Sequence, residues 1–304
     1  MRWVILFLLC ILTTPVLPQS KVSVGASLAP CNFLGDLGGG SGNRKPFFFD
    51  TNLKSTRLSG SLFLGIQLSP VFTWKNSVSV LKVSGDDHLT RDITSGRYVR
   101  NLNFQSLIYE FYSAIEFNFL KVFSRKKEFA VHPYFVLGAG VFHFNPYTYY
   151  QGNKVYLQPV GTEGQGLPGY AKNYSLTAFC VPVGAGFRFH ISPHLSMCFE
   201  LINRYTNTDF IDDVSGQYPD AKVIIANKAP GPAHLTIQLS DRRSEIDPNK
   251  APLSLPGAYR GNPKQKDTYI NIAALSFYYN IGTFENKQYL LHRNGKHRRG
   301  CYHF

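Results

Sequence analysis

Large apolar and aromatic residues alternate with polar residues along several stretches of the chain. In residues 107–119, six of the seven odd positions are large and apolar or aromatic, whereas the even positions include Glu110 and Glu116. Successive side chains of a strand point to opposite faces, so this period of two predicts a strand with one apolar and one polar face. Residues 175–191 and 195–205 show the same pattern. A helical period of 3.6 would scatter these charges around the helix axis.

The alternation predicts eight strands in all, some with a fainter pattern than these three. They lie near residues 21–29, 57–69, 71–84, 105–120, 129–145, 174–191, 194–210 and 268–284. An even number of antiparallel strands places both chain ends on the same side of a barrel, as in bacterial outer-membrane barrels.

The connections between these strands alternate between short and long. The short ones are Ser69-Pro70, residues 121–128 and residues 192–194, and the long ones are about 30–56, 85–104, 146–173 and 211–267. Tight periplasmic turns and long outside loops produce this alternation in an up-and-down barrel, whereas a soluble β-sandwich has no reason to sort its loops in this way. The sequence therefore predicts an all-β, eight-stranded antiparallel up-and-down transmembrane β-barrel with long extracellular loops. Prolines such as Pro230 and Pro252 favour an irregular lid or mobile segment over further strands in the last loop.

The N-terminus has the pattern of a secretory signal peptide. Arg2 precedes ten residues without a charged or polar group, from Trp3 to Leu12. As a helix these ten residues span about 15 Å, half of a bilayer's hydrocarbon core of about 30 Å. We therefore predict a signal peptide over residues 1–19, an outer-membrane barrel over 20–284 and a location in the cell outer membrane.

A basic tail over residues 285–304 follows the last predicted strand. It carries five basic residues and one acidic residue, and on this topology it lies in the periplasm. Two interpretations remain open. The tail is either a solvated extension or a basic contact for an acidic periplasmic protein or for lipid headgroups.

The composition is typical of a chain with part of its surface in contact with something other than water. Hydrophobic residues make up 44% and aromatic residues 14%, whereas charged residues are only 17%, against about 25% in a typical soluble domain. Outer-membrane lipid is thus the expected partner. The formal net charge is +13, but nucleic acid is not expected as a partner because an exported barrel does not meet it.

The polar faces of the predicted strands place charged side chains inside the barrel. These are Glu110, Glu116, Arg188, Glu200 and Arg204. An eight-stranded barrel is just wide enough for side chains to fill it, so no open diffusion pore is expected. Buried charges are stable only when paired, and the short connection between the sixth and seventh strands places Arg188 opposite Cys198 and diagonal to Glu200. We therefore predict an Arg188–Glu200 pair in a structural ion network, and favour this over a proton path.

Three acidic residues, Asp209, Asp212 and Asp213, follow the seventh strand and are predicted to lie at the extracellular rim. Carboxylates are ligands that Ca²⁺ prefers, but the twelve-residue calcium-loop pattern is missing. Hydrogen bonds that brace the loops are therefore the favoured interpretation, and we expect neither a metal nor another cofactor.

Neither the cysteines nor the histidines form a motif that carries chemistry. The cysteines outside the signal peptide, Cys31, Cys180, Cys198 and Cys301, show no C-x-x-C unit and are expected to be free. The histidines His88, His132, His143, His190 and His194 are scattered, and none lies in a nucleophile motif. The sequence therefore predicts no enzyme.

Four segments carry a resemblance to a known family, and residues 182–188 and 267–269 are two of them. Residues 200–218 contain a Glu, an Arg, the run Thr206-Asn207-Thr208-Asp209-Phe210-Ile211-Asp212-Asp213-Val214-Ser215 and a later Tyr. This segment resembles a signature of the PorG-type outer-membrane barrel family of Bacteroidetes. Residues 33–39 are similar to the family's N-terminal Gly-Asp-Leu element. The departures are Phe210-Ile211 in place of the usual Tyr-Leu, and the basic tail.

The resemblance implies a small outer-membrane barrel without catalytic residues. It further implies an accessory part in type IX protein secretion, as an anchor or assembly component associated with periplasmic ring proteins of the PorK/PorN type. The alternative from the loop lengths is an adhesin or small-ligand-binding barrel that uses its long extracellular loops.

Overall fold

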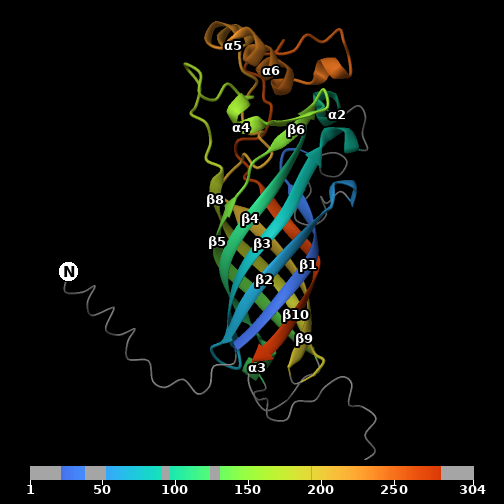
Figure 1. The fold of residues 1–304 in the computed structure, drawn as a ribbon, viewed down its shortest axis with the longest axis vertical. Helices are drawn as coiled ribbons and strands as arrows, with labels where there is room; N and C mark the ends of the chain where they lie inside the picture. The colour runs from blue at the N-terminus through green and yellow to red at the C-terminus, as the bar shows by residue number, and fades with distance from the viewer. Residues whose placement is uncertain (1–21, 38–52, 91–95, 124–130, 193, 282–304) are drawn as a thin grey trace, which may run out of the picture.

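Eight long antiparallel strands close into a barrel (Figure 1). The computed structural model describes residues 22–37, 53–90, 96–123, 131–192 and 194–281. The barrel strands are β1 (Val22–Leu34), β2 (Arg57–Gln67), β3 (Phe72–Asp86), β4 (Asn103–Phe117), β5 (Val131–His143), β8 (Thr177–His190), β9 (Leu195–Thr206) and β10 (Thr268–Ile281). The barrel closes because β1 pairs with both β2 and β10.

The predicted eight-stranded antiparallel barrel is thus confirmed, with each strand in its predicted part of the chain. The predicted signal peptide 1–19 and the basic tail 285–304 lie outside the described residues, as does Cys301. The described chain begins and ends at one end of the barrel, where Val22 pairs with Ile281. The short connections lie at this same end, which we call the turn end (Figure 1).

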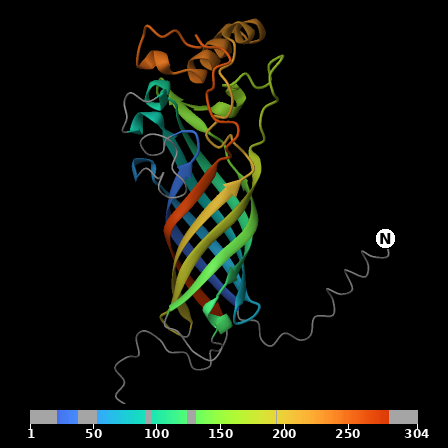
Figure 2. The same cartoon turned by 180° about the vertical axis from the view of Figure 1, so that it is seen from behind.

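The long connections gather at the opposite end, which we call the loop end. Figure 2 shows from the other side that the same segments cover the barrel mouth. We call residues 144–176 and 207–267 the cap. Its elements are β6 (Tyr147–Tyr150), β7 (Asn153–Tyr156), α4 (Leu157–Val160), α5 (Ala221–Asn227), α6 (Pro230–Ser240) and η4 (Arg243–Glu245). Beside the cap lie η2 (Leu53–Ser55), η3 (Asp87–Leu89) and α2 (Gly96–Arg100), while α3 (Leu120–Phe123) lies at the turn end.

The expectation that residues 211–267 form an irregular segment was wrong in part. The segment contains α5 and α6, and α6 begins with Pro230 in its first turn, where a missing backbone N–H costs no helical hydrogen bond. Ile224, Ala233 and Leu253 form a small apolar core in the cap with Leu167 and Tyr218. Proline thus starts a helix here instead of preventing one.

The outer face of the barrel is an apolar belt. On β4, Leu107, Tyr109, Phe111 and Ile115 are between 38% and 53% exposed. From Leu107 to Phe117 the strand makes ten residue steps, or about 34 Å, and at a tilt of about 40° its height is about 26 Å. This height matches the apolar band of about 25 Å on outer-membrane barrels. Among the described residues, no helix is long and apolar enough to span a membrane.

Candidate functional site

Three carboxylates and three basic side chains from the described strands meet inside the barrel. They are Glu110, Glu116 and Glu200 with Lys75, Arg188 and Arg204. All five charged residues that the sequence pattern placed in the lumen are there, and the pattern missed Lys75. The formal charges of this set cancel, which is what burial requires.

Glu200, on β9, lies at the centre of the first cluster. Its Oε1 accepts hydrogen bonds from Lys75 Nζ at 2.7 Å and from the Tyr134 hydroxyl at 2.8 Å. Its Oε2 accepts one from the Ser276 hydroxyl at 2.9 Å. Lys75 comes from β3, across the lumen from β9, so the pair ties opposite walls of the barrel together.

The predicted pairing of Arg188 with Glu200 was wrong, although its register was right. Arg188 does lie opposite Cys198, and its Nε lies 3.3 Å from the Cys198 sulfur. Its Nη2, however, donates to Glu116 at 2.6 Å, and Tyr278 donates to the same carboxylate at 2.8 Å. Glu200 lies on the cross-strand diagonal from Arg188 and is within its reach. Lys75 already binds Glu200, however, and the Arg188 side chain points to Glu116 on β4 instead.

Glu110 and Arg204 form the second cluster, nearer the loop end. Arg204 donates from Nε and Nη2 to the two oxygens of Glu110, at 3.1 and 3.2 Å. Tyr269 donates to the same carboxylate at 2.6 Å. Between the two clusters lies a cavity of about 10 Å³ beside Lys75 and Asn271, about the smallest space that holds one water molecule. The lumen is therefore filled.

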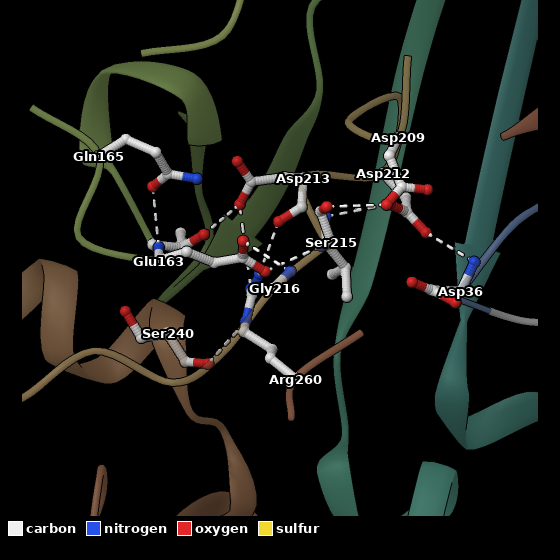
Figure 3. Close-up of polar contacts among 12 residues, drawn as sticks. Asp36, Glu163, Gln165, Asp209, Asp212, Asp213, Ser215, Gly216, Ser240 and Arg260 are labelled. Carbon is white, nitrogen blue, oxygen red and sulfur yellow. Dashed lines mark hydrogen bonds and ion pairs between the residues drawn. The ribbon is translucent and has the colours of Figure 1, made fainter. Parts of the chain in front are cut away.

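Asp212 holds the first loop against the barrel rim. Its Oδ2 accepts the backbone N–H of Asp36 at 3.1 Å, as Figure 3 shows. The same oxygen accepts the backbone N–H of Leu37 at 3.0 Å, and Oδ1 accepts that of Val214 at 3.0 Å. One carboxylate thus joins two segments about 175 residues apart in the chain.

Asp213 binds two further segments of the cap. It has a φ of 63°, a left-handed conformation that aspartate tolerates better than most residues. Its carboxylate accepts hydrogen bonds from the Thr162 hydroxyl and from the Tyr174 hydroxyl at 2.7 Å. Arg260 donates to the Asp213 carbonyl and pairs with Glu163 at 3.2 Å.

Glu163 holds the backbone of the residues that follow Asp213. Glu163 accepts the backbone N–H groups of Ser215 and Gly216, both at 2.9 Å, as Figure 3 shows. The Ser215 hydroxyl donates to Asp209 at 2.7 Å. We call these residues the rim hub: Asp36, Glu163, Asp209, Asp212, Asp213, Arg260 and Asp267. Asp267 belongs to it because its Oδ2 accepts the backbone N–H of Ile211.

Four aspartates of the rim hub, Asp209, Asp212, Asp213 and Asp267, have raised pKa values because their carboxylates are buried. Burial raises the pKa of Asp209 to about 7 and that of Asp213 to about 6. Burial, reinforced by the nearby charge of Asp36, raises the pKa of Asp212 well above its ordinary value. Burial and the charge of Asp212 do the same to Asp267.

The three predicted rim aspartates thus come together as loop-bracing acceptors. Within the described part of the chain, no group of three or more His, Cys, Asp or Glu side chains is placed to hold a metal ion. Cys31, Cys180 and Cys198 are free and buried. Asp36, Glu163, Arg260 and Asp267 were missed, because they lie in loops where no periodicity indicates which side chains meet.

Comparisons with known proteins found one matching family model and several similar solved structures. The family model described as "Domain of unknown function (DUF6089)" matches residues 2–226. No curated protein matches the sequence. Similar solved structures include Ail, the attachment invasion locus protein of Yersinia pestis, with 10% identity, coverage of 87% of this chain and 100% of that chain, and a TM-score of 0.38. A major outer membrane protein from Thermus thermophilus has 12% identity, coverage of 87% and 100%, and a TM-score of 0.36. Neisserial surface protein A has 8% identity, coverage of 86% and 97%, and a TM-score of 0.35.

Proposed function

The chain belongs to the DUF6089 family, whose description assigns no function, and from its geometry we propose that it is a non-enzymatic outer-membrane anchor for a protein secretion complex. The observation that carries this proposal is the filled lumen beneath a braced cap. A barrel whose interior is occupied by Lys75, Arg188 and Arg204 with their carboxylates offers no path to a solute. What remains for partners to use is its surface.

Membrane insertion is supported by the outer face. The belt of exposed apolar side chains is about 26 Å tall on β4, close to the apolar band of about 25 Å on outer-membrane barrels. A closed barrel also has no unpaired strand edge, so its backbone polar groups are satisfied without water. We place the loop end outside the cell and the turn end in the periplasm.

The secretion role is supported by the residues that resemble the PorG-type family. The Gly-Asp-Leu element and the Asp-Asp-Val-Ser run lie far apart in the chain but bind each other, through Asp212 and the backbone of Asp36 and Leu37. The signature therefore builds one structural unit, which braces the cap. Partners of the PorK/PorN type would bind at the periplasmic turn end or through residues 285–304.

A second function has its own supporting observation. The cap exposes large apolar side chains to solvent, with Ile225 62% and Tyr259 74% exposed. Where such side chains form one contiguous patch, they are typical of sites that bind other molecules. The alternative function is therefore an adhesin or small-ligand-binding barrel that uses the cap.

The deciding experiment is gene deletion in the native host, followed by assays of secreted proteins and of the stability of the periplasmic ring. We expect both to fail in the deletion strain and to return with the full-length gene. Two further complementing genes separate the functions: one ends after Phe284, and one carries Ile225→Ser and Tyr259→Ser. Unchanged secretion in the deletion strain would rule out the anchor role, and loss of surface binding with the cap variant alone would favour the adhesin.

A further inference from the structure

The hairpin of β6 and β7 carries an exposed lysine on a platform of tyrosine rings. Lys154 Nζ lies 3.9 Å from the centre of the Tyr147 ring and 4.7 Å from that of Tyr156. Tyr149 pairs with Lys154 across the hairpin and is itself 51% exposed. Ring faces attract a cation and limit its motion, so the ammonium group is held in place before any ligand arrives.

This hairpin lies directly above the apolar belt. Tyr147 pairs with Gln105 of β4, and Gln105 is two residues, or about 7 Å of strand, beyond Leu107 at the upper edge of the belt. In Figure 1, β6 accordingly lies beside the loop end of β4. If lipid surrounds the belt, Lys154 and its tyrosines lie at the level of the outer-leaflet headgroups, where aromatic side chains are favoured.

A second lysine flanks the same face. Lys82 of β3 pairs with Leu107. It lies two residues after Val80 and four after Val78, and is therefore on the same outer face of the barrel as these exposed valines. The strands β3, β4, β6 and β7 are successive neighbours, so three strand spacings, or about 14 Å, separate Lys82 and Lys154 across the strands. Along the strands Lys154 is level with Asn103, four residues or about 14 Å beyond Leu107, so the two backbones are about 20 Å apart. Neither lysine forms an ion pair with a carboxylate of the described residues.

We propose that Lys82 and Lys154 bind the two phosphates of a phosphorylated disaccharide lipid in the outer leaflet, whose acyl chains lie on the apolar belt below. Charge complementarity and continuity with the belt identify this occupant. One phosphate cannot reach both ammonium groups, whereas a disaccharide headgroup phosphorylated at both ends can. The inference rests on the membrane placement of the proposed function, but not on its secretion role.

The test is native mass spectrometry of the full chain in detergent, titrated with bisphosphorylated lipid A, monophosphorylated lipid A and phosphatidylcholine. We expect the wild type to bind them in that order of affinity. Lys154→Gln and Lys82→Gln should each weaken binding of the bisphosphorylated lipid about fivefold and remove the preference over the monophosphorylated one. Lys222→Gln, which changes an exposed lysine of α5, is the matched control and should bind as the wild type does.

Three results would overturn the proposal. The first is unchanged lipid affinity in Lys154→Gln and Lys82→Gln. Folding of each variant is verified by the band that shifts on heating in semi-native electrophoresis. The second is an equal loss in Lys222→Gln, which would indicate general electrostatics. The third is full displacement of the lipid by inorganic phosphate, which would make the site one for free phosphate. If the chain binds this lipid but secretion does not depend on it, the proposed anchor role is wrong and the proposed lipid site stands.

Discussion

Lys75 and Glu200 lie 125 residues apart in the chain, yet their Nζ and Oε1 atoms are 2.7 Å apart inside the barrel. Lys75 also lies 3.6 Å from Glu116. It is therefore the shared cation of two buried carboxylates, while the aromatic rings of Phe63 and Tyr278 lie 4.5 and 5.4 Å from the same ammonium. Lys75 thus neutralises charge on two of the three carboxylates in the lumen.

Lys75→Met is expected to destabilise the barrel by about 3–5 kcal/mol, because it leaves buried negative charge without its partner. The measurement is the temperature at which the folded band is lost in semi-native electrophoresis. Lys82→Met, on the outward face of the same strand, is the control and should barely change that temperature. The double variant Lys75→Met with Glu200→Met should regain much of the loss, and a double variant no more stable than the single one would contradict the pairing.

Gly186 leaves room for Tyr134, which donates to Glu200. A Cβ at position 186 would lie 2.8 Å from the Tyr134 hydroxyl oxygen and 2.9 Å from the Phe199 carbonyl oxygen. Gly186→Val should therefore displace Tyr134 and cost about 1–3 kcal/mol of folding free energy, measured by denaturant unfolding in detergent. Ala185→Val adds two methyl groups on the outward face, and an equal loss there would show that the lumen is not the cause.

Asp212→Ala should loosen the cap without unfolding the barrel. The substitution leaves the backbone N–H groups of Asp36, Leu37 and Val214 without their acceptor, at about 1–3 kcal/mol for each buried group. Limited proteolysis should cut residues 216–267 sooner, while the heat-modifiable band remains. Asp247→Ala, which changes an exposed turn, should be cut at the wild-type rate, and equal rates for all three proteins would contradict the bracing role.

The cap should be held more tightly at low pH. Burial raises the pKa of Asp209 to about 7, so the folded cap binds a proton that the unfolded chain releases near pH 4. The stabilisation is therefore fully present below about pH 4 and is lost as the pH rises through 7. Hydrogen-exchange protection factors of residues 207–216 should fall between pH 5 and pH 8. Asp209→Asn should weaken this dependence, leaving the part that Asp212, Asp213 and Asp267 contribute, and protection that rises with pH would contradict the sign.

The alternation of side chains was enough to predict the barrel, because a half-buried strand must place its polar side chains on one face. The same rule could have located Lys75, since Trp74, Val78 and Val80 fix the outward phase of β3 and leave position 75 inside. Which inward charge binds which could not be predicted. Arg188 has several carboxylates within reach, and its choice of Glu116 depends on what the opposite wall supplies.

The structure of the cap could not be predicted from the alternation of side chains. The hairpin of β6 and β7 has no alternation to indicate it, because tyrosines occupy both of its faces. Asp209, Asp212 and Asp213 could be placed at the rim, since they directly follow a strand. Their acceptor roles depend on Thr162, Tyr174 and other residues from distant loops, which sequence spacing does not bring together.

The central claim is that lipid, not water, surrounds the outer face of the barrel, and Trp74 tests it directly. The chain has two tryptophans, Trp3 and Trp74, so Trp3→Phe leaves Trp74 as the one tryptophan, whose fluorescence can be excited selectively over that of the tyrosines. The Trp74 ring lies in the belt, with its Nε1 donating to the Ser113 hydroxyl at 2.7 Å. After reconstitution into vesicles, lipids with brominated acyl chains should quench its fluorescence, and aqueous iodide should not. Quenching by iodide together with indifference to bromolipid would contradict the claim.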